Sequence, residues 1–307
     1  MDLQAELRGF LTSRRDRLSP EEAGMPPFSG ARRVPGLRRE EVAYLAGISA
    51  DYYTRLEQGK STGVSDDVLE SIARALQLDD VEREHLMTLT RSIRSTRAIR
   101  RPVPPTPTVR AGTQAVLDAI TVPAFLQNAR LDMLAANSIG WAIYPHAKGT
   151  QSGRFNHLRY QFLDPRARDF FRDWDLATNN SVALLKTALT AEPDDPETIK
   201  LVGELSTQSA RFRTLWAEHD VLRYRHGVKR YQHPLVGQLD FTFESYAVNG
   251  EPGLMMSVYV PEPNSSTSQA LGLLASWTCN DAGSAERAAK PTQREDAQTT
   301  TTDGAQA

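Results

Sequence analysis

Apolar side chains recur at three- and four-residue spacing through the first ninety residues, which is the pattern of helices that place one face on a core. The first such stretch spans residues 3–17, and others span residues 38–46, 49–59, 65–76 and 81–90. Asp79 and Glu82 stand at capping-box spacing before the last stretch. We therefore predict an all-α domain of five helices over residues 1–91.

Within this domain, the stretch from Arg38 to Gly59 predicts two short helices joined by a tight turn. Gly47 stands where the first helix must end, because glycine adopts the left-handed conformation at low cost. Ser49 can accept a backbone N–H at the start of the second helix, and Gly59 ends that helix. Helix, glycine turn and capped helix indicate a helix-turn-helix, although an ordinary helical hairpin shares part of this pattern.

In a helix-turn-helix, the N-terminal residues of the second helix meet base edges in the DNA major groove. Double-stranded DNA is therefore the first expected partner. Arg39 can hold a phosphate through two N–H groups, and Arg55 follows one turn after the start of the second helix. The predicted DNA-contacting residues are Arg38, Arg39, Ser49, Ala50, Asp51, Tyr52 and Arg55.

Charge is unevenly distributed along the chain, although the net charge is only −2. Eight arginines and three acidic residues lie between Arg8 and Arg39, next to the predicted reading helix. Arg32 and Arg33 lie in a long loop over residues 19–37, which either follows the phosphate backbone or is a solvated insertion. A Pro- and Arg-rich stretch at residues 92–110 predicts an interdomain linker whose arginines contact either DNA or solvent.

The second half predicts a mixed domain over residues 111–278. After a helix near 111–119, a β-hairpin spans residues 125–133, and Asn137 can cap a short helix that ends near Tyr144. A helical region follows from 155 to 219, then alternating strands and a last helix at 268–276. This order predicts one antiparallel sheet with helices on one face, a PAS-like arrangement. Residues 279–307 are polar and are predicted to be a disordered tail.

Both halves resemble known families. EEVAYLAGIS followed by YYTRLEQG resembles the lambda-repressor-like, or XRE, class of helix-turn-helix regulators. The second half, with VPAFLQNARLDMLAAN, NHLRYQFLDPRARDFFRDW and HPLVGQLDF, resembles the MmyB-like ligand-binding domain of bacterial regulators. The fold class expected is therefore a five-helix lambda-repressor-like domain followed by a PAS-like α+β domain.

The resemblance implies a cytoplasmic regulator, a homodimer, whose pocket takes a small apolar effector such as a fatty acid. The residues permit such a pocket, since a sheet covered by helices can leave a cavity. The same aromatic residues also suit plain core packing. The candidate ligand-binding residues are Asn137, Trp141, Phe162, Trp174, Leu185, Phe212 and Trp216.

The sequence gives little support for an enzymatic function. His219, His226 and His233 recur every seven residues, but Gly227 and Pro234 exclude a common helix, and no cysteine or carboxylate cluster joins them. Gly59 and Lys60 resemble the end of a phosphate loop but follow a helix. We expect no cofactor, metal or catalytic residue, no membrane span and no secretory signal. The alternatives are a second domain that serves only dimerisation or protein interaction, and an enzyme tethered to DNA.

Overall fold

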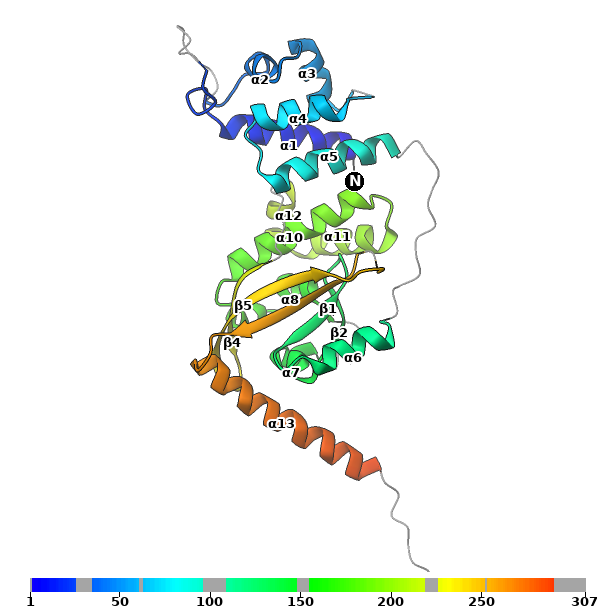
Figure 1. Ribbon diagram of the computed structural model, residues 1–307, viewed down its shortest axis with the longest axis vertical. Coiled ribbons are helices and arrows are strands. Elements are labelled where there is room, and N and C mark those ends of the chain that lie inside the picture. Colours follow the sequence, from blue (N-terminus) through cyan, green and yellow to red (C-terminus); the bar gives the residue numbers. More distant parts are fainter. Residues whose placement is uncertain are drawn as a thin grey trace, which may run out of the picture.

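The computed structural model describes residues 2–25, 35–60, 63–95, 109–147, 155–218, 226–251 and 253–289. Two compact parts follow one another along the long axis of the molecule (Figure 1). The predicted roles of Arg32 and Arg33, of linker residues 96–108, and of His219 fall outside the described residues.

Five helices form the first part, as the apolar pattern predicts. They are α1 (Leu3–Arg17), α2 (Arg39–Ala46), α3 (Ala50–Glu57), α4 (Asp66–Ala75) and α5 (Asp80–Ser95). Their inward faces share one core around Phe10, Val42 and Tyr53. The helix-turn-helix of α2 and α3 is thus one corner of a closed helical domain.

The predicted helix ends have the expected local causes. Gly47 has a φ of 68° and its N–H bonds back to the last turn of α2. The Ser49 hydroxyl accepts the Tyr52 N–H at 3.1 Å. Asp79 accepts the Glu82 N–H at 2.8 Å, and Glu82 in return accepts the Asp79 N–H at 3.2 Å, which is the predicted capping box. One boundary differs, because α5 continues to Ser95 and the break placed at residue 91 lies inside it.

The second part is built on a six-stranded antiparallel sheet of order β3-β2-β1-β6-β5-β4. Chain order gives β1 (Ala124–Gln127), β2 (Asp132–Ala136), β3 (Phe155–Asn156), β4 (His226–His233), β5 (Gly237–Ala247) and β6 (Met255–Pro261). The early hairpin therefore lies beside the last strand, with β4 at one edge. The sequence pattern missed β3, which is two residues long and adjoins a helix without a turn.

Helices cover both faces of this sheet, not one as predicted. They are α6 (Ala111–Ala119), α7 (Ser138–Ile143), α8 (His157–Leu163), α9 (Ala167–Phe170), α10 (Trp174–Ala191), α11 (Pro196–Gln208), α12 (Ala210–Ala217) and α13 (Ser266–Ala289), with a 3-10 turn at Pro145–Ala147. One face packs Phe125, Phe241 and Tyr259 against α7, α9 and α13. The other packs Leu126 and Ala135 against Leu117 of α6.

Helix α13 departs from the predicted disordered tail. It runs to Ala289, beyond the end predicted at residue 276, and its last turns project away from the sheet (Figure 1). Ala270, Leu271 and Leu274 bury its first turns in the domain core. The tail predicted for residues 279–307 is thus helical over its described part.

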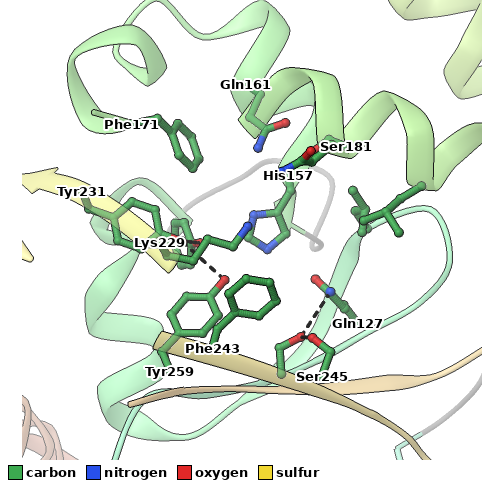
Figure 2. A pocket seen from close by; sticks show the side chains of 15 residues that line it. Gln127, His157, Gln161, Phe171, Ser181, Lys229, Tyr231, Phe243, Ser245 and Tyr259 are labelled. Atoms are coloured by element: carbon green, nitrogen blue, oxygen red, sulfur yellow. Dashed lines mark hydrogen bonds between the residues drawn. The ribbon is translucent and has the colours of Figure 1, made fainter. Parts of the chain in front are cut away.

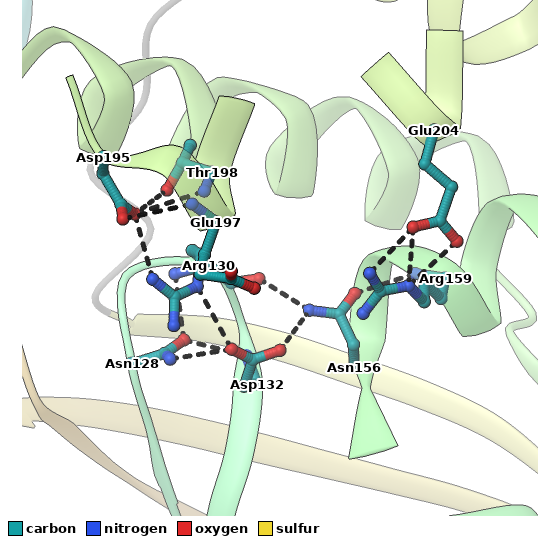
Figure 3. A network of polar contacts seen from close by, with 9 residues as sticks. All are labelled: Asn128, Arg130, Asp132, Asn156, Arg159, Asp195, Glu197, Thr198 and Glu204. Carbon is teal, nitrogen blue, oxygen red and sulfur yellow. Dashed lines mark hydrogen bonds and ion pairs between the residues drawn. The ribbon is translucent and has the colours of Figure 1, made fainter. Parts of the chain in front are cut away.

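A polar network holds the β1–β2 turn against the helices (Figure 3). The carboxylate of Asp132 accepts hydrogen bonds from Asn128 Nδ2 and Asn156 Nδ2, each at 2.8 Å. Arg130 joins this carboxylate to Asp195 at the start of α11, at 2.9 Å from Asp195. The network fixes Leu131 at a φ of 62°, and the Leu131 carbonyl accepts the His157 N–H at the start of α8.

The two parts touch through α5 and α10. The hydroxyl of Ser92 on α5 donates to the carbonyl of Thr190 on α10 at 2.8 Å. Figure 1 shows this contact region midway along the molecule, with α2 and α3 at the far end of the first domain. No helix in the described part of the chain is long and apolar enough to span a membrane.

Asn137 supplies our first prediction, because its side chain ties the start of α7 to the chain before β1. Its Oδ1 accepts the Gly140 and Ala124 N–H groups at 2.8 and 3.2 Å, and its Nδ2 donates to the Ile120 and Val122 carbonyls at 2.8 and 2.7 Å. Asn137→Ala should destabilise the second domain by about 3 kcal/mol, since it removes a helix cap and leaves buried backbone groups unpaired.

Urea denaturation followed by tryptophan fluorescence measures this effect, because all four tryptophans lie in the second domain. Ser138→Ala, at the exposed neighbouring position, is the control and should change stability by less than about 0.5 kcal/mol. Equal stabilities for the two variants would contradict the role of the Asn137 amide.

Candidate nucleic-acid interface and ligand cavity

The reading helix α3 lies at the end of the molecule farthest from the second domain (Figure 1). Its inward residues Tyr53, Leu56 and Glu57 are buried. Ala50, Asp51 and Arg55 are exposed, as expected of residues that meet base edges. The exposed face of α3 is therefore accessible to the major groove of DNA.

Two of the predicted contact residues also have structural roles. The Ser49 hydroxyl caps α3 and is already engaged with the Tyr52 N–H. Tyr52 is partly buried against the domain core. Arg55 lies on the exposed face and its Nε approaches the Asp51 carbonyl at 3.4 Å. Arg55 and Asp51 are thus the charged side chains that the helix presents outward from its first two turns.

Glu57, in the last turn of α3, is a buried carboxylate that joins three helices. Arg39 at the start of α2 donates to it twice, from Nε at 3.1 Å and from NH2 at 3.2 Å. Thr12 of α1 donates to it at 2.9 Å. These bonds to Glu57 raise the pKa of Arg39 above its ordinary value. The two N–H groups of Arg39 that were predicted to hold a phosphate are therefore directed at Glu57.

The basic cluster of the first domain also contains arginines that serve its core. Arg14 is buried over the Phe10 ring and its Nε lies 2.7 Å from Glu82. Arg15 is buried and donates to the Leu37 carbonyl at 2.6 Å. The Arg38 side chain is less buried than these two, and its NH1 lies 3.7 Å from the Glu40 carboxylate. Charge counting along the sequence thus overstated the cations available to DNA.

A cavity of about 40 Å³ lies between the sheet of the second domain and helices α8 and α10 (Figure 2). Aromatic rings form part of its wall, and amides, hydroxyls, an imidazole and an ammonium group form the rest. The lining residues are Gln127, Leu131, Tyr144, His157, Gln161, Phe171, Asn180, Ser181, Leu184, Lys229, Tyr231, Phe243, Ser245, Ser257 and Tyr259.

Burial shapes the electrostatics of this cavity. The ammonium group of Lys229 points toward the His157 ring (Figure 2), and burial lowers the pKa of Lys229 to about 8. Burial, with the charge of Lys229 nearby, lowers the pKa of His157 to about 3. At neutral pH the imidazole is therefore uncharged and the lysine is mainly protonated.

The hydroxyl groups of three lining tyrosines form a chain. Tyr144 and Tyr231 hydroxyls lie 2.9 Å apart, and the Tyr231 hydroxyl lies 3.4 Å from that of Tyr259. Two other lining groups, Gln161 Oε1 and Asn180 Nδ2, are buried and have no hydrogen-bond partner among the described residues. An occupant with matching donors and acceptors would satisfy both groups.

None of the seven predicted ligand-binding residues lines this cavity. The side-chain amide of Asn137 forms hydrogen bonds with backbone groups, as described above. Trp141 and Trp174 pack on the edge of the core under the sheet. The remaining four, Phe162, Leu185, Phe212 and Trp216, belong to a separate cluster between α8, α10, α11 and α12. The aromatic pattern identified the core of the domain, because a core and a cavity wall have the same apolar periodicity.

One signal for the cavity was present in the sequence. On β4, Gly227, Lys229 and Tyr231 share the less exposed face, and Lys229 is a cation at an inward position. A charged residue is uncommon at an inward position of a strand, because burial of its charge costs free energy. The described residues contain no group of three or more His, Cys, Asp or Glu side chains able to hold a metal ion.

Comparison with known proteins agrees with this geometry. A helix-turn-helix domain family model matches residues 6–86, which hold most of α1, all of α2 to α4 and the start of α5. A second model, described as the MmyB-like transcription regulator ligand binding domain, matches residues 109–274 and so covers more than half of the chain. No curated protein matches the chain. With a helix-turn-helix domain ahead of a ligand-binding domain, the chain belongs to the MmyB-like family of transcription regulators.

Proposed function

We propose that this regulator binds a two-fold DNA site through α3 and changes its DNA affinity when the cavity of the second domain is filled. The observation that carries the proposal is the position of α10. This helix contributes Asn180, Ser181 and Leu184 to the cavity wall. Its last turn receives the hydrogen bond from Ser92 of α5. One rigid element thus contacts both the cavity and the DNA-binding domain.

A ligand can alter DNA binding only through a difference in its affinity for two arrangements of the protein. Because α10 is a continuous helix, a shift of its cavity-facing turns is transmitted to its end at α5. The range of typical coupling is on the order of 1–3 kcal/mol, or roughly five- to 150-fold in affinity. This mechanism requires no direct contact between ligand and DNA.

The fatty acid implied by the family resemblance needs a larger space than the cavity provides. About 40 Å³ corresponds to a few water-sized positions, since one water requires about 10–15 Å³ by the same measure. An acyl chain would therefore require α8 or α10 to move away from the sheet. The fatty acid remains the prediction of the resemblance, and the proposed sensing role does not depend on it.

DNA recognition gives the second prediction. Arg55→Ala and Asp51→Ala should change base preference, because base-edge contacts carry specificity. Arg39→Ala should weaken binding to all sequences alike, since it leaves the buried Glu57 carboxylate short of its main partner. Binding to duplexes selected from a random pool, at several salt concentrations, measures both effects.

The salt dependence of DNA affinity distinguishes an arginine that contacts phosphate from one that pairs with Glu57 inside the domain. Arg38→Ala should reduce the slope of log affinity against log salt by about one, as expected for a lost phosphate contact. Arg39→Ala should leave this slope unchanged. A reduced slope for Arg39→Ala would show that its guanidinium contacts phosphate after all.

The third prediction concerns symmetry. We propose a homodimer, because the reading helices of paired helix-turn-helix domains address half-sites about 34–36 Å, or one DNA turn, apart. Duplexes selected by the full chain should contain an inverted repeat with that spacing or a multiple of it. Selection of a single unrepeated half-site that a monomer binds would exclude the dimer.

The fourth prediction tests coupling without any ligand, because coupling is reciprocal. Binding of a selected duplex by the first domain should raise the stability of the second domain by about 1–3 kcal/mol, as reported by its tryptophans. Ser92→Leu should abolish this increase by separating α5 from α10, whereas Arg91→Leu, at the exposed neighbouring position, should retain it.

An unrelated duplex at the same concentration is the DNA control for this measurement. If the selected duplex leaves the stability of the wild-type second domain unchanged, the two domains are independent. The second domain would then be a dimerisation or interaction module, which is the alternative function.

A further inference from the structure

Two buried amide atoms on the helix side of the cavity lack a hydrogen-bond partner among the described residues. They are Gln161 Oε1 of α8 and Asn180 Nδ2 of α10, and the two residues are 5% and 4% exposed. Figure 2 shows the Gln161 amide directed toward the space between the Phe171 and His157 rings. Leaving buried polar atoms unpaired costs free energy, so an occupant of the cavity is expected to pair with them.

The polar groups on the sheet side of the cavity have partners within the fold. The Ser245 and Ser257 hydroxyls lie 2.6 Å apart, and Gln127 Nε2 donates to the Ser257 hydroxyl at 3.4 Å. The Lys229 ammonium group has contacts within the fold, among them the Phe243 ring, whose centre lies 4.9 Å away. No occupant is therefore required to pair with Lys229, and the buried unpaired atoms of the described wall belong to α8 and α10.

The two unpaired atoms are opposite in kind. Gln161 Oε1 can only accept a hydrogen bond, and Asn180 Nδ2 can only donate one. A carboxylate has no hydrogen to donate to Gln161, and an ammonium group has no lone pair to accept from Asn180. A hydroxyl group both donates and accepts, and it rotates to suit its partners. The pair of amides therefore favours an uncharged hydroxyl compound over an ion.

The remaining wall and the volume limit the carbon part of this compound. Rings of Phe171, Phe243 and Tyr259 line the same cavity and can pack against carbon atoms (Figure 2). A volume of about 40 Å³ holds roughly three water-sized centres, which is the space of a molecule of about four to six non-hydrogen atoms. Resting on the sensing function proposed above, we infer that the cavity binds a small uncharged diol, with one hydroxyl at Gln161 and the other at Asn180.

Ligand-observed NMR titrations of the full chain test this inference with four probes. Propylene glycol has two neighbouring hydroxyls, n-propanol lacks one of them, propionate has a charge and no hydroxyl, and hexadecanoate is the apolar alternative. Propylene glycol should bind at least about fivefold more tightly than n-propanol or propionate, because a buried amide that stays unpaired has roughly that effect.

A variant of the α10 amide separates a binding role from a structural one. Asn180→Leu should weaken propylene glycol binding at least about fivefold. Because it removes a buried unpaired donor, it should not lower the urea midpoint of the ligand-free second domain. Asn179→Leu, at the exposed neighbouring position, is the control and should change neither quantity. Gln161→Leu is the second variant, with the same expected results as Asn180→Leu.

Each outcome supports or overturns the inference. If propylene glycol does not bind, the cavity holds water only and the inference is wrong. Equal binding of n-propanol, unchanged binding by both leucine variants, or a lowered urea midpoint in both would also overturn it.

The same titrations distinguish the inference from the sensor function. Binding of hexadecanoate or propionate alone, with a change in affinity for the selected duplex, would overturn the inference while supporting the sensor function. Propylene glycol binding that depends on Asn180 but leaves affinity for the selected duplex unchanged would support the inference and refute the sensor function.

Discussion

The hydrogen bonds to the Asp132 carboxylate are the constraint on which the second domain depends. They close the β1–β2 turn, join it to α8 through Asn156, and reach α11 through Arg130. Burying such a carboxylate is costly unless its oxygens are satisfied, and removal of a partner is strongly destabilising. Because the turn is held in this way, Leu131 and His157 both reach the cavity wall. The network itself contributes no side chain to the wall, but it positions Leu131 and His157, which do line the cavity.

The first domain was predictable from the sequence because its signals are local. The turn at Gly47 and the cap at Ser49 each depend on residues within four positions, and both are present in the structure. The cavity depends on residues from β1, α8, α10, β4, β5 and β6, which only the folded chain brings together. Periodicity marks Leu185 and Phe212 as buried but cannot separate filled core from cavity wall. The functional signal was the exception to the pattern, an inward lysine at position 229.

The sequence was also insufficient to predict which arginines are available to DNA. The sequence places Arg14, Arg15 and Arg39 near the reading helix, but it does not reveal that acids far along the chain accept them. Glu57 and Glu82 form ion pairs with these arginines inside the domain. Part of the basic cluster therefore stabilises the domain. Net charge is a sound argument about partners only after such internal pairs are subtracted. The exposed Arg38 and Arg55 are then the cations best placed to meet DNA.

Because α5 is long, a small tilt at Ser92 would produce a larger displacement at the other end of the helix. Its 16 residues make a rod about 24 Å long, at about 1.5 Å of rise per residue. A tilt of about 10° at the Ser92 end would displace the opposite end by about 4 Å, which is slightly more than the roughly 3.4 Å between successive base pairs. In a two-fold assembly the displacement acts on both copies in opposite directions. A small tilt of α5 would therefore shift the DNA-binding domain by about the spacing of one base pair.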